Sequence, residues 1–489
     1  LLFSALPHSL LACASLILQD KRIALESHFL PMKVLIVRYS EVGIKGDFTR
    51  RKMERLLINN LLASAKRKGC GKVKVVHGEG RIFLYGDVDC LAKSSTMVFG
   101  VKSVSPAEEL EFTSLDQIAE KAEELWKEEV KGRSFAVRVR RLGQHPFSSI
   151  DVADAIGSRL VKYGRVNLDS PEVELHVEVR KDMAYFYDQV LEGPGGLPLG
   201  SEGRVLALFS GGIDSPVASW MVMKRGVYVD FLYCNLGSEV TKNAVLDVAR
   251  KLIEWSVGYT PKFFLAECGK ITKGIMTGLD KRLWPIAFKR ALYLLADKLA
   301  TSKGYGGIVT GESLGQVSTQ NLSALKVLNR GISLPILRPL LGFDKDEIVK
   351  MARHIGTYEY SSKIPEFCSV FSFHPKTKFT YRVIEEVDKV VSSAVDEVLG
   401  AVREVKLYGE EEEPDLQGLK VDVLPEGAVL VDLTGKAENA VRLTPRQVME
   451  FVFKNGPDKT YVFLTGGDKF NVDLVRSLRK MGVKAFVLS

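Results

Sequence analysis

The sequence predicts a multidomain α/β protein built around a doubly wound parallel sheet. An apolar run, Val205–Phe209, leads into Ser-Gly-Gly-Ile-Asp-Ser at 210–215, and a helical pattern follows. From 204 to about 395, apolar strands alternate with helices, which is the order of a parallel sheet covered by helices on both faces. The 489 residues are enough for about three domains.

The composition is that of a globular protein with a slight basic excess. Hydrophobic residues make up 46% and charged residues 26% of the chain, and the formal net charge is +8. This charge is compatible with a nucleic-acid partner without identifying one. No apolar stretch approaches the ~18 residues of a membrane-spanning helix, so we expect no membrane partner.

The cysteines show no metal-binding or disulfide pattern. None of the six lies in a C-x-x-C pair, so neither a zinc site nor a disulfide scaffold is indicated. A reducing cytosol is the simplest setting for such a chain, and we therefore expect a cytoplasmic protein. The six are Cys13, Cys70, Cys90, Cys234, Cys268 and Cys368.

Residues 1–31 are interpreted as an upstream extension of the folded protein. They begin without Met and lack the basic segment that opens a signal peptide, although a targeting peptide is the alternative. Met32 then precedes a patterned strand at 33–38.

The region 32–104 is predicted to fold as strand, helix, strand, strand and helix. Its first helix, about 47–68, is basic, because 32–70 carries ten Lys and Arg residues against three acidic ones. A run of charge is often only the solvated face of a helix. A nucleic-acid surface and a plain solvated face therefore both stay open here.

The region 105–192 contains a basic strand. Arg138 and Arg140 alternate with Val137 and Val139, so the two arginines share one face of that strand, and Arg141 adds a third charge. A one-sided basic stripe is a stronger sign of nucleic-acid binding than net charge. The predicted helices are 114–130 and 149–163, and the predicted strands include 134–140 and 172–180.

Two segments are predicted to be linkers. Residues 193–203 are rich in Gly and Pro, and 396–417 contain a run of glutamates before Pro414. The chain ends in a smaller α/β piece, 418–489, with strands near 428–432, 461–464 and 484–488.

The loop at 210–215 has the features of an anion site. Glycines let the backbone approach a ligand closely, and the following helix presents free amides and the positive end of its dipole. The loop is not a Walker A motif, because no G-x-x-x-x-G-K-[ST] occurs. It resembles the pyrophosphate-binding PP-loop of ATP pyrophosphatases, which cleave ATP between its α- and β-phosphates.

Further segments resemble the tRNA 4-thiouridine synthetase family. The most specific is Thr-Gly-Glu-Ser-Leu-Gly-Gln at 310–316, and the segments 336–348 and 38–46 agree with it. The resemblance implies an α+β ferredoxin-like domain at 32–104, a THUMP RNA-binding domain at 105–192, a PP-loop domain at 204–395 and a Cys-less, rhodanese-like domain at 418–489.

The resemblance also implies the residues of an adenylation site. Asp214 would position Mg²⁺ or the loop itself, since Mg²⁺ is usually held by one or two carboxylates plus phosphates; a helix N-cap is its alternative role. Arg338 is a candidate phosphate contact or, alternatively, part of a salt bridge. The candidate ATP and pyrophosphate ligands are Ser210, Gly211, Gly212, Asp214, Ser215, Gly311, Glu312, Gln316 and Arg338.

Sulfur delivery is where the chain departs from many family members. The chain has no cysteine after Cys368, so the last domain cannot carry a persulfide. We expect sulfur from sulfide, from a separate persulfide donor protein or from an iron–sulfur cluster. The resemblance implies Cys368 and Cys268 as catalytic cysteines, with Cys234 a candidate third cluster ligand; a buried, inert thiol is the alternative for each.

The resemblance implies a tRNA uracil 4-sulfurtransferase, which uses ATP to adenylate uracil O4 and then replaces that oxygen with sulfur. The alternatives are a catalytically silent tRNA-binding protein and a PP-loop ligase for a small molecule. AMP release and a gel shift with tRNA separate the three. The expected partners are tRNA and ATP, a homodimer is a candidate assembly, and the candidate tRNA contacts are Lys45, Arg50, Arg51, Arg138, Arg140 and Arg141.

Overall fold

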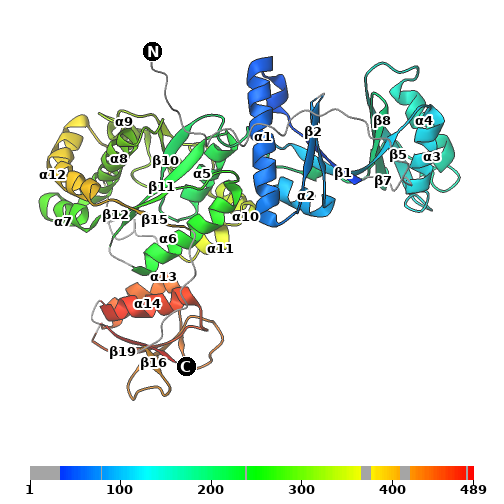
Figure 1. Ribbon diagram of the computed structural model, residues 1–489. Helices are drawn as coiled ribbons and strands as arrows, with labels where there is room; N and C mark the ends of the chain where they lie inside the picture. Colours follow the sequence, from blue (N-terminus) through cyan, green and yellow to red (C-terminus); the bar gives the residue numbers. More distant parts are fainter. Residues whose placement is uncertain are drawn as a thin grey trace, which may run out of the picture. The chain divides into compact units, whose positions relative to one another are not determined.

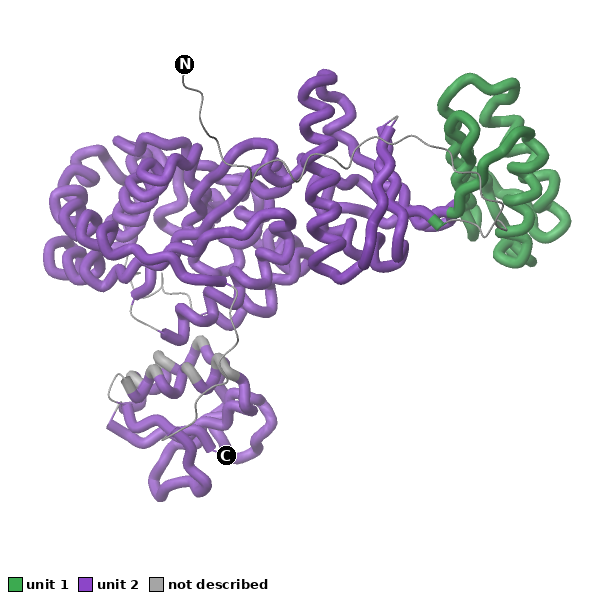
Figure 2. Tube along the Cα trace, viewed as in Figure 1, with its two compact units in different colours: residues 1–33, 108–186 green, residues 34–107, 187–489 purple. Residues whose placement is uncertain are grey.

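The structure is a computed structural model (Figure 1), and it describes residues 33–78, 80–236, 239–364, 376–407, 419–456, 458–480 and 483–488. The described residues form two compact units, one of Glu108–Phe186 and one of Val34–Ala107 with Tyr187–Ser489 (Figure 2). The predicted division at 104/105 falls inside β4, Ser103–Glu111, whose first residues pair in the larger unit and whose last residues pair in the smaller one. The predicted upstream extension lies outside the described residues.

The N-terminal part of the larger unit has the predicted order of strand, helix, strand, strand and helix. Helix α1 buries Met53, Leu57 and Leu61, which recur every fourth residue and pack against Leu35 of β1. Strand β3 pairs antiparallel with both β1 and β2. The elements are β1 (Lys33–Arg38), α1 (Asp47–Lys68), β2 (Lys74–Gly78), β3 (Arg81–Tyr85) and α2 (Val88–Ser95).

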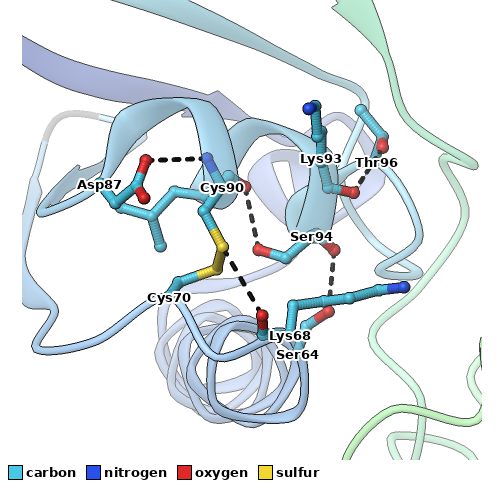
Figure 3. Close-up of a disulfide and its surroundings, with 9 residues drawn as sticks. Ser64, Lys68, Cys70, Asp87, Cys90, Lys93, Ser94 and Thr96 are labelled. Carbon is cyan, nitrogen blue, oxygen red and sulfur yellow. Dashed lines mark hydrogen bonds between the residues drawn. A yellow bond between two sulfur atoms is a disulfide. The ribbon is translucent and has the colours of Figure 1, made fainter.

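A disulfide joins Cys70, just after α1, to Cys90 in α2 (Figure 3). The sequence pattern argued against disulfides, and that expectation fails for this pair. The two cysteines are 20 residues apart in the chain, and the packing of α2 against α1 brings them together. Closing a loop of this length stabilises a fold by about 3 kcal/mol, chiefly by restricting the unfolded chain.

The smaller unit is an α+β fold in which the basic strand β5 lies between β7 and the edge strand β6. Strand β5 pairs in parallel with β7, with Arg138 opposite His176 and Arg140 opposite Glu178. Val137 and Val139 pack on the core that α3 and α4 cover, so the two arginines lie on the other face, as predicted. The elements are α3 (Leu115–Trp126), β5 (Ser134–Leu142), α4 (Ser149–Leu160), β6 (Arg165–Val166), β7 (Val173–Arg180) and β8 (Met183–Tyr187).

The sheet that carries the Gly-rich loop is doubly wound and parallel, as predicted. Its strand order is β14-β13-β10-β11-β12-β15, and the last strand runs antiparallel to β12. Helices α5, α6 and α10 pack on one face, and α7, α8 and α12 pack on the other. In the part of the chain that the structure describes, no helix is long and apolar enough to cross a membrane.

The elements from β9 to β15 follow in chain order, and β9 belongs to the sheet of β4. They are β9 (Leu191–Glu192, paired with β4), β10 (Arg204–Leu208), α5 (Asp214–Lys224), β11 (Tyr228–Asn235), α6 (Glu239–Leu252), β12 (Phe263–Glu267), α7 (Gly269–Gly278), α8 (Trp284–Ser302), β13 (Ile308–Val309), α9 (Leu322–Leu328), β14 (Ile336–Leu337), α10 (Lys345–His354), α11 (Tyr358–Ser361), α12 (Tyr381–Gly400) and β15 (Arg403–Val405).

The first segment predicted as a linker, 193–203, is largely packed. Leu197 and Leu199 are 4% and 2% exposed. Gly196 has a φ of 75°, and a Cβ there would lie 2.0 Å from the carbonyl oxygen of Lys224, so its glycine serves close packing. The first part of the predicted second linker includes β15, while 408–418 lie outside the described residues.

The C-terminal part is a small α/β fold, as predicted. Its parallel sheet has the order β16-β20-β19-β17-β18, and Val431, Tyr461 and Phe463 form the centre of its core. Its rhodanese-like character stays a prediction. The elements are β16 (Lys420–Val421), β17 (Val429–Asp432), β18 (Val441–Arg442), α13 (Pro445–Asn455), β19 (Thr460–Leu464), α14 (Lys469–Lys480) and β20 (Lys484–Leu488).

Candidate functional site

The loop between β10 and α5 is folded by the serines at its two ends. The Ser210 amide donates to Ser215 Oγ at 3.2 Å, and the Gly212 amide donates to Ser210 Oγ at 3.3 Å. Gly211 has a φ of 73°, and a Cβ there would lie 2.7 Å from Ile364 Cδ1, so the position requires glycine. The loop ends at the amino terminus of α5, where amides and the helix dipole favour an anion.

Asp214, the first residue of α5, is held by side chains from two other segments. Lys345 Nζ lies 2.6 Å from Asp214 Oδ1, and Gln316 Nε2 donates to Oδ2 at 3.2 Å. Gln316 follows β13 and Lys345 opens α10, so both come from the carboxyl edge of the sheet, where doubly wound folds bind ligands. The Asp214 side chain is 23% exposed and can be reached by a ligand.

The structure brings together several of the residues predicted to bind ATP. Asp214 and Gln316 are in contact, and Gly311 lies against the start of α5, where a Cβ would be 2.8 Å from the Ser215 nitrogen. Lys345 was missed. The sequence feature that could have pointed to it is a lysine at the start of a helix, where the helix dipole disfavours a positive charge.

Glu312 forms a buried ion-pair cluster beside the loop. It is 3% exposed, with Lys289 Nζ 2.7 Å from Oε1 and Arg338 Nε 2.7 Å from Oε2. The hydroxyls of Tyr293 and Thr310 donate to Oε2 at 2.5 and 2.9 Å. Burial alone would raise the pKa of Glu312, but Lys289, Tyr293 and Arg338 outweigh it and hold the pKa at about 2. The carboxylate is therefore ionised at neutral pH.

Arg338 forms a salt bridge, as the alternative prediction for this residue had it. Besides its bond to Glu312, its Nη2 donates to Asn329 Oδ1 at 2.7 Å, and the side chain is 12% exposed. Glu312 and Arg338 thus fix the segment after β13 against the segment after β14. A direct contact of either residue with ATP stays a prediction.

The cysteine expected near the site is part of a second disulfide. Cys268 follows β12 and is bonded to Cys234 in β11, so it is not a free thiol as expected. The pair is 34 residues apart in the chain, and the pairing of β11 with β12 makes them neighbours. Cys368 lies outside the described residues.

An iron–sulfur cluster does not fit the described residues. Cys234 and Cys268 are bonded to each other, and among the residues that the structure describes no group of three or more His, Cys, Asp or Glu side chains could hold a metal ion.

The predicted tRNA contacts of the larger unit lie at the start of α1. Arg50 Nη2 lies 2.7 Å from Asp47 Oδ1, so part of its charge is neutralised within the helix. Arg51 is exposed, and Lys45 is half-buried just before α1. Arg51 is the better placed of the two arginines for a phosphate.

The predicted tRNA contacts of the smaller unit differ in their surroundings. Arg138 Nε donates to Glu174 Oε1 at 3.1 Å, and Arg141 Nη1 donates to the carbonyl of Gly143 at 3.0 Å. Arg140 is exposed and makes no ion pair within the described residues. It is therefore the arginine of this strand most open to a phosphate.

The smaller unit has an aromatic pocket that was not predicted from the sequence. It has a volume of about 560 Å³, and Phe112, His145, Phe147 and Lys181 contribute to its walls. His145 and Phe147 stack with ring centroids 5.2 Å apart. The available signal was His-Pro-Phe at 145–147, directly after the basic strand, since interleaved aromatic and basic residues are typical of nucleic-acid surfaces.

Comparisons with known proteins agree with this architecture. Family models match the chain over 34–105 (ThiI ferredoxin-like domain), 112–188 (THUMP domain) and 200–393 (thiamine biosynthesis protein, ThiI). The tRNA sulfurtransferase of Pyrobaculum aerophilum is 46% identical over 472 residues, which are 94% of this chain and 96% of that protein. A probable tRNA sulfurtransferase of Sulfurisphaera tokodaii is 42% identical over 361 residues, which are 73% of this chain and 95% of that protein.

A solved structure covers the same parts. The crystal structure of a 4-thiouridine synthetase–RNA complex with bound ATP is similar at a TM-score of 0.67 and 28% identity, over 77% of this chain and 100% of that one.

Proposed function

The chain belongs to the tRNA sulfurtransferase family, and we propose that it thiolates a tRNA uridine to 4-thiouridine in an ATP-dependent reaction. The observation that carries the proposal is the convergence of the Gly-rich loop, Gln316 and Lys345 on Asp214. A catalytically silent tRNA-binding protein would not need this arrangement. A ligase for a small molecule would not need a THUMP domain.

The reaction has to convert a poor leaving group into a good one. Uracil O4 is a poor leaving group, so O4 first attacks the α-phosphate of ATP as N3 loses its proton, and pyrophosphate departs. Hydrosulfide then adds to C4, AMP leaves with the former O4, and the proton on sulfur passes to N3, which restores the N3–H lost in the first step. Each step forms one bond and breaks one, and with sulfide as donor no oxidant or reductant is required.

The residues of the loop support this reaction by binding the departing pyrophosphate. We assign this role to the loop amides and to the Ser210 and Ser215 hydroxyls, which face each other at 3.3 Å. Lys345 supplies a positive charge beside the same helix end. Mg²⁺, when bound, would neutralise phosphate charge, and the reachable Asp214 carboxylate fits the single-carboxylate, phosphate-assisted sites that this ion prefers.

The sulfur comes from sulfide or from a separate persulfide donor protein, because the C-terminal part has no cysteine. We assign tRNA binding to Lys45, Arg51 and Arg140, together with the aromatic pocket, which has room for an unstacked base. A tRNA substrate favours action in the cytoplasm. Structural disulfides are rare in reducing compartments, and hyperthermophiles are the exception. A cytoplasmic location therefore has to be reconciled with the two disulfides of this chain. Homodimerisation stays a prediction, which light scattering tests.

The proposal is tested by measuring AMP release from ATP with and without a tRNA transcript, in the presence of Mg²⁺ and sulfide. We expect release that requires tRNA. Release that is equal without tRNA would favour the small-molecule ligase. Binding of tRNA in a gel shift without any AMP release would favour the silent binding protein.

A further inference from the structure

Two large apolar side chains at the start of α1 are almost fully exposed. Ile44, just before the helix, is 83% exposed, and Phe48, in its first turn, is 86% exposed. Burying a phenylalanine is worth about 1.5–3 kcal/mol, so leaving one in water forgoes that gain. Neither residue belongs to the core beneath α1. An exposed aromatic side chain bordered by charged residues is a feature of interaction surfaces.

Basic residues continue the same helix face. Arg51, Lys52 and Arg55 lie three, four and seven positions after Phe48, which places them on one side of the helix. All three are exposed, and within the described part of the chain none forms an ion pair or a side-chain hydrogen bond. The nearby acids have other partners: Asp47 pairs with Arg50 at 2.7 Å, and Glu54 accepts a hydrogen bond from the Tyr39 hydroxyl. The face is therefore an exposed aromatic ring followed by unpaired positive charge.

We propose that Phe48 forms a platform on which an unpaired base of the tRNA stacks, while Arg51, Lys52 and Arg55 contact the adjoining phosphates. The inference rests on the proposed function, since it names a contact for the same tRNA. An aromatic ring beside a row of basic side chains is how proteins hold unpaired nucleotides without reading their sequence.

Charge complementarity favours RNA over a second copy of the chain. In a two-fold symmetric dimer the same patch meets itself, so Arg51, Lys52 and Arg55 would face their own like charges. A polyanion instead neutralises them and leaves the ring free for a base. The two contact types also differ in their response to salt, because phosphate contacts release counterions and stacking does not.

The test uses the full chain and an unmodified tRNA transcript, with the Kd measured at several KCl concentrations. We expect Phe48→Ala to raise the Kd about fivefold or more with an unchanged salt slope, and Phe48→Trp to retain binding. Arg51→Ala should instead reduce the slope by roughly 0.7–0.9. Val423→Ala is the matched control, because Val423 is an exposed residue of the C-terminal part, at 77% exposure.

A second probe separates stacking from a general loss of affinity. For a fully paired RNA duplex of similar length, we expect Phe48→Ala to change the Kd by less than about twofold, the range of a surface substitution. An equal loss on tRNA and duplex would overturn the stacking assignment. Melting temperatures of Phe48→Ala and wild type should agree, since the ring contacts no core.

Two further outcomes would also overturn the inference. One is a Kd for tRNA that Phe48→Ala leaves unchanged. The other is a loss of self-association in light scattering with tRNA binding intact, which would make the face a contact between copies. If the wild-type chain failed to bind tRNA at all, the proposed function would fall together with this inference. Wild-type binding with an unaffected variant rejects the inference alone.

Discussion

Lys345 Nζ lies 2.6 Å from Asp214 Oδ1, although 131 positions separate the two residues in the chain. The contact ties the start of α10 to the start of α5, at the end of the Gly-rich loop. It places one cation and one anion where the phosphates of ATP are expected. We infer that Asp214 and Lys345 act as a pair in the adenylation step, with the carboxylate and the ammonium each able to turn to the nucleotide.

Replacing Asp214 tests the role of this pair. Asp214→Ala should lower tRNA-dependent AMP release at least about a hundredfold, the scale on which a charge-stabilising group acts in a transition state. The Kd for tRNA should stay nearly unchanged, because the candidate tRNA contacts lie on other elements. Asp346→Ala, an exposed acid on the same helix as Lys345, is the control. Normal AMP release by Asp214→Ala would refute the assignment.

Glu312 should make the stability of the fold depend on pH in the acidic range. Its pKa in the folded protein is about 2, against an ordinary 4.5, so its ionised form stabilises the fold above pH 4.5. This stabilisation, about 3 kcal/mol, should be lost as the pH falls from 4.5 towards 2. Melting temperatures measured across this window check the loss.

Variants of Glu312 supply the comparison. Glu312→Gln should lower the free energy of unfolding by about 3–5 kcal/mol at neutral pH, because Lys289 and Arg338 lose a buried partner. The free energy of unfolding of this variant should then fall less in acid than that of the wild type. Glu385→Gln removes an exposed carboxylate paired with Arg330 at 2.7 Å and should have little effect. Parallel acid profiles of wild type and Glu312→Gln would show that other groups control the transition.

The basic strand should control the salt dependence of tRNA binding. Replacing Arg138, Arg140 and Arg141 with alanine should lower the log–log salt slope by roughly 0.7–0.9 through Arg140, and by up to about 2–3 if Arg138 and Arg141 also exchange their partners within the protein for phosphates. Arg140→Ala alone should account for one such step, because Arg138 and Arg141 already bond to Glu174 and Gly143. An unchanged slope in the triple variant would mean that this strand does not meet the RNA.

Removal of the C-terminal part should leave thiolation measurable. A chain ending at Leu407 keeps β15 and the whole sheet of the Gly-rich loop. Nucleoside analysis with sulfide as donor checks the activity. Complete loss in a folded truncation would reveal a role for the part removed.

Local patterns were sufficient for much of the fold. The helix at 47–68 ends as predicted because Gly69 takes a left-handed conformation at its end. The alternation of strands and helices predicted the parallel sheet, and the resemblance assigned Gln316 and Asp214 to one site, where the two side chains are in contact. These features depend on neighbours in sequence or on general topology.

Other features depend on contacts that no local pattern contains. The Glu312 cluster joins α8, β13 and β14, and each disulfide joins elements that only the finished fold brings together. The segment 193–203 is rich in Gly and Pro like a linker, yet its glycines allow close packing. Composition alone does not distinguish these two uses of glycine.

We propose that this chain replaces the O4 oxygen of a tRNA uridine with sulfur at the expense of ATP. The most direct measurement is mass spectrometry of nucleosides from a tRNA transcript incubated with the full chain, Mg²⁺ and sulfide, with and without ATP. We predict 4-thiouridine in the ATP-containing reaction and none without ATP. Failure to detect 4-thiouridine with a folded protein that binds both tRNA and ATP would contradict the account.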